Sequence, residues 1–292
     1  MTKLKFKDKL VERLADEFTP EELKLLPAGF QTLDDVAIIN LKPELLPKKE
    51  VIAQALLDIL PYIKSVWGKV FGQSKVVGQF RTPTGLIHIL GPEKSEITLI
   101  ENGVKFTFDF TQIIFSKGNI HERSYLPKLV QTGEIILDMF AGIGYFSLMI
   151  AKHAEPARIH ACEINPVSYN FLIQNIEANH VGDIITPHFG DCGEIAPALA
   201  VEGLKADRII MGVFPAPKEY LPSAFACVNN KTGTVIHYEG TVENKDIDPL
   251  LQHIKDAVEV SDIVHEFELQ ETRFVKNVGI NEQHAVLDVF VR

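Results

Sequence analysis

The segment Leu137–Leu148, LDMFAGIGYFSL, combines an acid, two glycines and the start of a helix, directly after an apolar strand. Gly142 and Gly144 allow a tight turn and a close approach of the backbone to a ligand, and the following helix offers unpaired N–H groups. Asp138 ends the strand beside this loop. Ser147 stands where a dinucleotide fingerprint requires its third glycine. The pattern therefore predicts a cofactor loop that differs from a dinucleotide site.

Acids also follow the next two predicted strands. Glu163, in HACEINP, lies 19 residues after Gly144. An acid at this place can accept hydrogen bonds from both hydroxyls of a ribose. Asp191, in HFGDCGE, suits the amino group of an adenine, and Cys192 is expected to pack near that ring rather than react, because no activating histidine is evident. Helix capping is the alternative role for both acids.

Strands and helices alternate after Tyr125, and this alternation positions the acids. The pattern predicts an α/β fold with a mainly parallel, doubly wound, Rossmann-like sheet. Ligands bind such sheets at the carboxyl ends of the strands. The expected strands are 134–140, 157–164, 184–189, 206–214, 234–240, 260–275 and 284–292, and the expected helices are 145–153, 166–180 and 248–257.

The N-terminal part of the chain has a different pattern of expected helices and strands. Residues 1–30 are expected to form a helical segment, with Thr19 as the N-cap of a helix that begins at Pro20. Residues 31–112 are expected to form a small α+β domain, and 113–292 the cofactor-binding domain. The small domain should contain a strand at 34–41, a helix at 48–66 interrupted near Pro61, four short strands, and a type I′ hairpin turn at Asn102-Gly103. The four short strands are expected at 75–80, 85–90, 96–101 and 104–110.

Composition excludes several classes of protein. The chain has 292 residues, enough for about two domains, and its 46% of hydrophobic residues exclude a mainly disordered chain. Three cysteines without metal-ligand spacing indicate reduced thiols and no metal site. The N-terminus lacks the apolar core of a signal peptide, and no apolar run is long enough to span a membrane. We therefore expect a cytoplasmic protein.

Three further segments carry a specific resemblance: FSKGNIHER (115–123), ADRIIMGVFPAPKEYL (206–221) and GTVIHYEGTVEN (233–244). Together with the cofactor loop and ACEINP, they resemble the archaeal and eukaryotic wybutosine-synthesis aminocarboxypropyltransferases over about residues 30–292. The resemblance implies a class I S-adenosylmethionine-dependent fold. It also implies transfer of the 3-amino-3-carboxypropyl group from S-adenosylmethionine to 4-demethylwyosine at position 37 of phenylalanine tRNA, with release of methylthioadenosine.

The related tRNA guanine-37 N1-methyltransferases are the main alternative. They typically carry Asn-Leu-Pro after the fourth strand, where this chain has Gly212, Val213, Phe214 and Pro215. Glycine cannot supply the amide, which favours aminocarboxypropyl transfer, although Gly212 could instead only relax a tight turn. A small-molecule methyltransferase and a non-catalytic RNA- or cofactor-binding module are weaker alternatives.

The resemblance also implies roles for individual residues. Ser116 and Arg123 would hold the amino-acid end of the cofactor, since arginine pairs with a carboxylate through two charge-assisted hydrogen bonds. An exposed ion pair of Arg123 with Glu122 or another acid is the alternative. Lys117, Gly212 and Pro215 are expected at the substrate. No residue is an obvious catalyst.

A proton must leave the base after transfer. His237 and Glu239, near the end of the fifth strand, are weak catalytic candidates, because a strand-end His-Tyr-Glu is more often structural.

The charge distribution bears on the RNA partner. The net charge of −10 by itself argues against nucleic acid, but residues 1–125 carry 17 basic and 16 acidic side chains, and 126–292 carry 12 and 23. Because phosphate contacts depend on local patches, we expect a basic strip on the small domain and its border, and a monomer would suffice. The strip should include Lys64, Lys69, Lys75, Arg81, Lys94, Lys105, Lys117 and Arg123.

Overall fold

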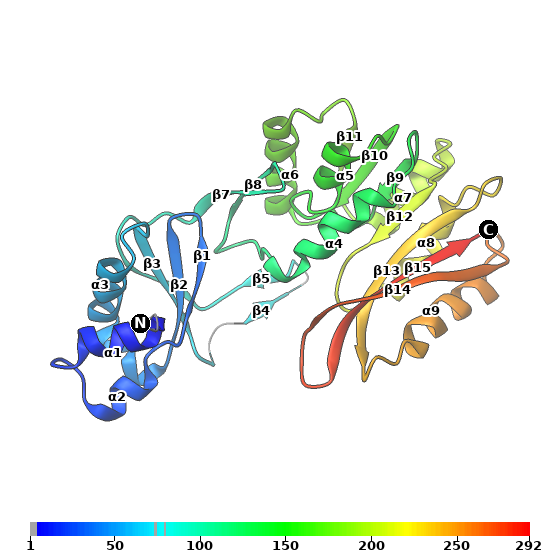
Figure 1. The fold of residues 1–292 in the computed structure, drawn as a ribbon. Helices are drawn as coiled ribbons and strands as arrows, with labels where there is room; N and C mark the ends of the chain where they lie inside the picture. Colours follow the sequence, from blue (N-terminus) through cyan, green and yellow to red (C-terminus); the bar gives the residue numbers. More distant parts are fainter. Residues whose placement is uncertain (1–4, 73–74, 79) are drawn as a thin grey trace. The chain divides into compact units, whose positions relative to one another are not determined.

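The computed structural model describes residues 5–72, 75–78 and 80–292, and for Lys117 it describes the backbone alone. The chain forms two compact units (Figure 1). Unit 1 combines Met1–Leu99 with Thr107–Phe115, and unit 2 combines Ile100–Phe106 with Ser116–Arg292. The described part of the N-terminal helical segment belongs to unit 1. The domain boundaries drawn from the sequence at residues 30 and 112 stay predictions.

Unit 1 is built on a four-stranded sheet with the order β1-β2-β3-β6. The β1–β2 and β3–β6 pairs are antiparallel, and β2–β3 is parallel. Its elements are α1 (Phe6–Leu14), α2 (Pro20–Leu25), β1 (Phe30–Leu33), β2 (Val36–Leu41), the 3-10 helix η1 (Pro43–Lys48), α3 (Lys49–Ile59), β3 (Ser65–Val70), β4 (Val76–Val77), β5 (Thr82–Pro83) and β6 (Leu86–Leu90).

The helices of unit 1 bury one apolar face against this sheet. Leu10 and Leu14 of α1 share a core with Ile52 and Leu56 of α3 and with Ile39 of β2. These residues recur at the spacing of one helix face or one strand face, which explains why both helices pack there.

Three local predictions for unit 1 have different outcomes. The Thr19 side chain accepts a hydrogen bond from the Glu22 N–H, which confirms the predicted cap of α2. The helix expected to reach Val66 was predicted too long: α3 ends at Ile59, and Ser65 begins a buried strand. Pro61 lies between them and cannot continue helical hydrogen bonding. The strand expected at 75–80 is reduced to the two residues of β4, and Gln79 lies outside the described residues.

The strands β7 (Glu96–Glu101) and β8 (Val104–Asp109) form a hairpin. Its turn residues Asn102 and Gly103 have φ angles of 50° and 80°. Positive φ at both positions is what a type I′ turn requires, so the predicted turn is confirmed.

Unit 2 contains a seven-stranded sheet with the order β11-β10-β9-β12-β13-β15-β14. The first five strands are parallel, whereas β15 is antiparallel to both β13 and β14. The predicted doubly wound α/β class is confirmed. Its elements are η2 (Lys117–Asn119), α4 (Ile120–Tyr125), η3 (Leu126–Lys128), β9 (Ile135–Asp138), α5 (Ser147–His153), β10 (Arg158–Glu163), α6 (Pro166–Asn179), β11 (Ile185–Phe189), α7 (Cys192–Val201), β12 (Arg208–Met211), η4 (Lys218–Tyr220), α8 (Leu221–Ala226), β13 (Thr234–Glu243), α9 (Asp248–Glu259), β14 (Phe267–Asn277) and β15 (Glu282–Val291).

Helices cover this sheet (Figure 1). Helices α7, α8 and α9 share one apolar core with side chains such as Leu137, Ile209 and Ile236 of the sheet. Helices α5 and α6 pack on β10 and β11. Because successive strand residues point to opposite faces, strands buried on both sides are apolar throughout, as in Arg208–Met211 after its first residue.

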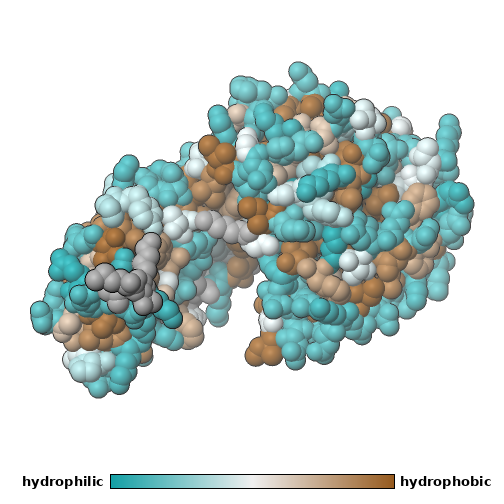
Figure 2. All heavy atoms as spheres, in the orientation of Figure 1, coloured by the Kyte–Doolittle hydropathy of each residue, from teal (hydrophilic) through white to brown (hydrophobic). Residues whose placement is uncertain are grey.

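The surface in Figure 2 is mainly hydrophilic, with small separate brown areas. Among the described residues, no helix is both long and apolar enough to cross a membrane.

Candidate cofactor site and transferase centre

Asp138, the last residue of β9, accepts hydrogen bonds from the glycine loop and from the helix that follows it. Its Oδ2 accepts a hydrogen bond from the Ser147 hydroxyl at 2.6 Å, and its Oδ1 lies 3.4 Å from the donating Phe140 N–H. The Asp138 side chain is fully buried, and burial raises its pKa to about 7 despite these hydrogen bonds. Ser147, which replaces the third glycine of a dinucleotide loop, is therefore the residue that ties the helix to the strand.

The two predicted loop glycines adopt conformations that favour glycine. Gly142 and Gly144 have φ angles of 59° and 96°. A Cβ atom at Gly142 would lie 2.6 Å from the ring of Tyr145, and one at Gly144 would lie 2.7 Å from Leu148. Both the φ angles and the lack of space exclude a side chain at Gly142 and Gly144. At these two positions the loop can present only its backbone to a ligand.

Glu163 fastens this loop to the next strand. Its Oε2 accepts a hydrogen bond from the Gly142 N–H at 2.7 Å, and its Oε1 accepts one from the Asn165 N–H at 2.6 Å. Burial raises the pKa of Glu163, although the backbone donors oppose that effect. Each oxygen keeps a further acceptor site, so the carboxylate could also receive ribose hydroxyls, which stays a prediction.

Asp191 caps α7, with its Oδ1 2.8 Å from the donating Gly193 N–H. The capping alternative therefore holds, and the adenine role stays a prediction beside it. Cys192 is buried, and burial raises the pKa of its thiol. A protonated buried thiol is a poor nucleophile, which favours the expectation that Cys192 only packs.

The strand register brings these groups to one edge of the sheet. Asp138 pairs with Ala161 of β10 and with Ile210 of β12, and Glu163 pairs with Phe189 of β11. Gly212 directly follows β12. This edge is where open α/β sheets bind their ligands.

Arg123, the expected carboxylate anchor, has a carboxylate partner within the chain. Its Nε and Nη2 donate to the two oxygens of Glu101 at 2.7 and 2.6 Å, and its Nη1 donates to the Ser116 carbonyl at 2.9 Å. The Arg123 side chain is only 2% exposed. The ion-pair alternative is therefore realised, with Glu101 rather than Glu122, and binding of a cofactor carboxylate stays a prediction.

Lys276 is a residue that the sequence reasoning missed. Its Nζ donates to the Ser116 hydroxyl at 2.6 Å, although β14 lies 160 residues further along the chain. Its position in a long, half-buried strand gave no signal of this contact. The side chain of Lys117, expected at the substrate, lies outside what the structure describes.

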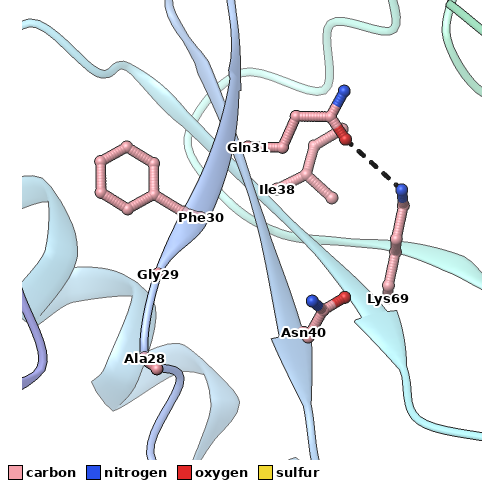
Figure 3. Close-up of a pocket in the computed structure, with 7 residues that line it drawn as sticks. All are labelled: Ala28, Gly29, Phe30, Gln31, Ile38, Asn40 and Lys69. Carbon is pink, nitrogen blue, oxygen red and sulfur yellow. Dashed lines mark hydrogen bonds between the residues drawn. The ribbon is translucent and has the colours of Figure 1, made fainter. Parts of the chain in front are cut away.

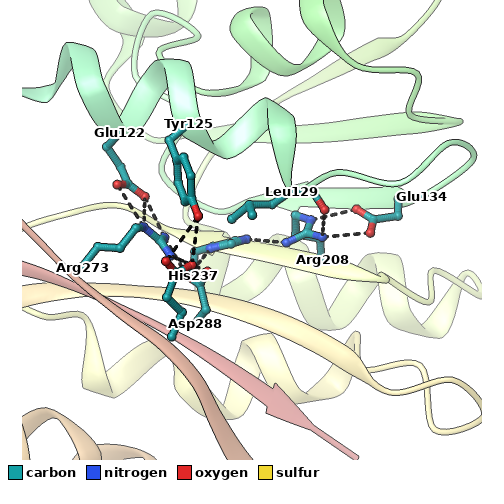
Figure 4. Close-up of polar contacts among 9 residues, drawn as sticks. Glu122, Tyr125, Leu129, Glu134, Arg208, His237, Arg273 and Asp288 are labelled. Carbon is teal, nitrogen blue, oxygen red and sulfur yellow. Dashed lines mark hydrogen bonds and ion pairs between the residues drawn. The ribbon is translucent and has the colours of Figure 1, made fainter.

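A row of charged side chains joins α4 to the sheet of unit 2 (Figure 4). Arg273 donates to Glu122 at 2.8 Å and to Asp288 at 2.5 Å. At the other end, Arg208 forms an ion pair with Glu134 at 2.7 Å. Buried charges are stable only when they are paired in this way, so the row fixes α4 against the strands.

His237 lies in the middle of this row. The Nη1 of Arg208 donates to its Nε2 at 2.7 Å, so its proton is on Nδ1, which donates to Asp288 at 2.6 Å. Burial lowers the pKa of His237, although Asp288 opposes that effect. Neither ring nitrogen remains for a substrate proton. The structure therefore speaks against His237 as a catalytic residue.

Glu239 and Gly212 lie together where β12 ends, although β13 continues past Glu239 to Glu243, so Glu239 is not at the end of its strand. A Cβ atom at Gly212 would lie 3.2 Å from Glu239 Oε1. The carboxylate is 2% exposed, and its Oε2 accepts a hydrogen bond from His284 Nε2 at 2.9 Å. Pro215, three residues after Gly212, is exposed.

Unit 1 carries a separate polar pocket of about 320 Å³ (Figure 3). Lys69 points across it to Gln31, with 3.5 Å between Nζ and Oε1, and Asn40 also lines it. In the described part of the chain, Lys69 has no carboxylate partner. The pocket lies on the open side of β1, β2 and β3 and is lined by Ala28, Gly29, Phe30, Gln31, Ile38, Asn40 and Lys69.

The expected basic strip needs a correction. Lys64 lies 3.5 Å from Asp35, and Lys94 forms ion pairs with Asp34 and Asp35 at 3.0 and 3.2 Å. Arg123 is buried against Glu101. These charges are neutralised locally, because the turn between β1 and β2 places acids beside the lysines. Three of the expected residues are therefore paired with acids of the chain, and the continuity of the strip stays a prediction.

Comparison with known proteins identifies the family. The description "TRM5/TYW2 methyltransferase domain" matches residues 98–269, and "TYW2 N-terminal domain" matches residues 10–94. The chain belongs to the TRM5/TYW2 family. Within it, the tRNA (guanine(37)-N(1))-methyltransferase Trm5b of Pyrococcus abyssi is 34% identical over 274 residues, which cover 92% of this chain and 77% of that protein.

Other members of the TRM5/TYW2 family are also similar to this chain. The tRNA(Phe) (4-demethylwyosine(37)-C(7)) aminocarboxypropyltransferase of Pyrococcus horikoshii is 34% identical over 239 residues, covering 82% of this chain and 81% of that protein. The crystal structure of Pyrococcus horikoshii TYW2 in complex with MeSAdo has a TM-score of 0.79 and 29% identity, and covers 98% of this chain and 99% of the other.

The residues of this TRM5/TYW2 member fit a nucleoside ligand. The glycine loop leaves a backbone-lined turn that a Cβ would fill. Two acids, Glu163 and Asp191, stand at the ends of adjacent strands and keep acceptor positions beyond their bonds to backbone N–H groups. Hydroxyls and an amino group are the donors that such acceptors need.

Proposed function

We propose that this protein transfers the 3-amino-3-carboxypropyl group of S-adenosylmethionine to C7 of 4-demethylwyosine at position 37 in the anticodon loop of tRNA(Phe). The observation that carries the proposal is Gly212 at the ligand edge of the sheet, in a chain whose aminocarboxypropyltransferase relative matches over 81% of its own length. The by-product of this reaction is methylthioadenosine.

The chain's own residues bind and orient the reactants. Glu163 receives the ribose hydroxyls, Asp191 the adenine amino group, and Cys192 packs beside the ring. Asp138, through Ser147, holds the glycine loop in shape. S-adenosylmethionine supplies an alkyl group activated by a sulfonium. The protein therefore gains rate mainly by holding the γ-carbon close to the base.

We assign the segment around Ser116 to the amino-acid end of the cofactor. Ser116 is held by Lys276 through its hydroxyl and by Arg123 through its carbonyl. Two cations at one short segment favour a carboxylate. Arg123 pairs with Glu101 and fixes the segment, and the Lys276 ammonium beside the Ser116 hydroxyl is the cation that we assign to the carboxylate.

Guanine-37 N1-methylation is the second candidate, favoured by the 34% identity to Trm5b over 274 residues. Gly212 argues against it, because the methyltransferase pattern places an asparagine amide there. A side chain at this position would also approach Phe146 to 2.8 Å.

The pocket of unit 1 supports contact with the tRNA backbone. Lys69 supplies a charge that no acid of the described chain neutralises, and Gln31 and Asn40 supply amide donors. Lysine and amide groups are typical partners of phosphate and ribose oxygens. We assign this pocket, rather than a continuous basic strip, to the RNA.

The deciding experiment is identification of the sulfur-containing product. Purified protein is incubated with S-adenosylmethionine and with tRNA(Phe) that carries either 4-demethylwyosine or unmodified guanosine at position 37. Methylthioadenosine with the first tRNA, and no reaction with the second, is the expected result. S-adenosylhomocysteine from the guanosine tRNA would replace the proposal with N1-methylation.

A further inference from the structure

Glu239 and His284 form a buried pair at the ligand edge, and one further polar atom of each residue has no hydrogen bond among the described residues. The Glu239 side chain is 2% exposed, and only its Oε2 has a hydrogen bond, from His284 Nε2 at 2.9 Å. Within the described residues, Oε1 accepts none. His284 is fully buried, and its Nδ1 has no partner either. Glu239 Oε1 is not among the fully buried atoms without a partner, so this oxygen is the part of the pair that a ligand donor can reach.

The histidine holds the carboxylate in one orientation. A carboxylate only accepts, so His284 Nε2 carries the hydrogen and donates it to Oε2. The ring of Phe214 packs edge-on against His284 with the centroids 4.5 Å apart. The imidazole is therefore fixed between the loop after β12 and Glu239. Oε1 is the remaining acceptor of the carboxylate.

Gly212 leaves this oxygen uncovered. The register pairs Met211 with Tyr238, which places Glu239, inside β13, beside Gly212, the residue that follows the end of β12. Gly212 is not among the residues with positive φ, so its backbone does not require glycine. The available space requires glycine instead, because a Cβ atom at this position would lie 3.2 Å from Glu239 Oε1 and 2.8 Å from the ring of Phe146.

The His237–Asp288 pair on the same two strands differs from the Glu239–His284 pair, because its remaining hydrogen-bond positions are filled. His237 and Asp288 also join β13 to β15, but Arg208 and Arg273 fill the remaining acceptor sites of that pair. The strands therefore hold one saturated pair and one open pair. The open pair is the one beside the reactive edge.

We propose that Glu239 is the proton acceptor of the transfer reaction and that His284 is its positioning residue. This inference rests on the proposed function. C7 of the base forms a bond to the γ-carbon, and the bond from that carbon to sulfur breaks with its electron pair going to sulfur. The base then carries a positive charge and a surplus proton on C7. Oε1 accepts this proton, and the C–H electron pair restores the aromatic ring.

The first experiment compares Glu239→Gln with Glu243→Gln, an exposed glutamate on the same strand. Glutamine keeps an acceptor oxygen but is not basic. We expect Glu239→Gln to lower kcat about 100-fold or more, with KM for S-adenosylmethionine and for tRNA within about twofold of wild type. Glu243→Gln should leave kcat unchanged. A wild-type kcat in Glu239→Gln, or a loss confined to KM, would overturn the proposal.

Isotopic substitution separates a base from a structural residue. With tRNA that carries deuterium at C7, wild type should show little isotope effect, and Glu239→Gln a larger one, because proton removal becomes slow. A reduced kcat without any isotope effect in Glu239→Gln would contradict the role.

If that variant fails to fold, Glu239→Ala with added formate and His284→Asn replace it. Formate should restore activity to Glu239→Ala alone, and absence of rescue together with a wild-type kcat in His284→Asn overturns the proposal.

The by-product keeps the two proposals apart. Release of S-adenosylhomocysteine by wild type refutes aminocarboxypropyl transfer whatever Glu239 does. Release of methylthioadenosine by wild type, with the same kcat in Glu239→Gln, refutes only the role of Glu239.

Discussion

Arg123 and Glu101 form a buried, two-pronged ion pair, with N–O distances of 2.7 and 2.6 Å. Glu101 ends β7 at the hairpin turn, and Arg123 lies in α4. Because Arg123 also donates to the Ser116 carbonyl, the pair fixes the segment that we assign to the amino-acid end of the cofactor.

Replacing Arg123 by alanine should therefore lower both the free energy of unfolding and the rate of the transfer reaction. The change leaves the Glu101 carboxylate buried without its partner, which typically costs about 3–5 kcal/mol. Urea unfolding measures this loss. The double variant Glu101→Gln/Arg123→Gln should be less destabilised than Arg123→Ala, because no isolated charge remains. Unchanged stability of Arg123→Ala with a large rise in KM for S-adenosylmethionine would instead support direct carboxylate binding.

Local signals predicted the parts of the site that local chemistry determines. The turn at Asn102-Gly103 and the loop at Gly142 and Gly144 follow from positive φ angles that few other residues adopt. The strand order followed from alternating helices and strands. The end of α3 was misplaced because Val66 continues an apolar pattern that suits a helix and a buried strand equally.

Partners distant in sequence could not be predicted. Lys276 reaches Ser116 over 160 residues, and His284 reaches Glu239 over 45. Such pairs depend on which strands become neighbours and in which register. The sequence therefore offered Glu239 and His237 together and lacked the feature that separates them, namely the open oxygen of Glu239.

Glu163→Gln should weaken S-adenosylmethionine binding about 10- to 100-fold. The Glu163 carboxylate holds the Gly142 and Asn165 N–H groups, and an amide that presents NH₂ to one of them loses a charge-assisted hydrogen bond worth about 1.5–3 kcal/mol. Calorimetric titration with S-adenosylmethionine measures the Kd. Glu177→Gln, an exposed change on α6, serves as control. An unchanged Kd in Glu163→Gln would remove this residue from the cofactor site.

Lys69→Ala should weaken tRNA binding more than Lys94→Ala does. Lys94 already forms ion pairs with Asp34 and Asp35, whereas Lys69 has no ion pair with any described acid and donates a hydrogen bond to Gln31. Loss of one phosphate contact should also reduce the slope of log K against log salt by about one. Filter binding between 50 and 300 mM salt tests this. Equal effects of the two changes would place the RNA elsewhere.

His160 and His188 should make the protein less stable in mild acid. The two rings meet at the edge of the sheet, with 3.0 Å between Nδ1 of His160 and Nε2 of His188. Burial first, and then the charges of His188 and Arg158, lower the pKa of His160 to about 4. Burial also lowers the pKa of His188.

The sign of the effect follows from proton uptake. Below pH 6.5 the unfolded chain protonates His160, whereas the folded chain does so only near pH 4. The unfolded state then binds more protons, so the free energy of unfolding falls as the pH drops from about 6.5 to about 4. Asp138, whose pKa is raised to about 7, acts in the opposite direction, so only a comparison of variants isolates the histidine. Urea unfolding at a series of pH values should show a smaller acid loss in His160→Asn than in wild type or in His265→Asn, which changes an exposed histidine. Identical pH profiles for all three proteins would show that His160 does not cause the fall in the free energy of unfolding at acid pH.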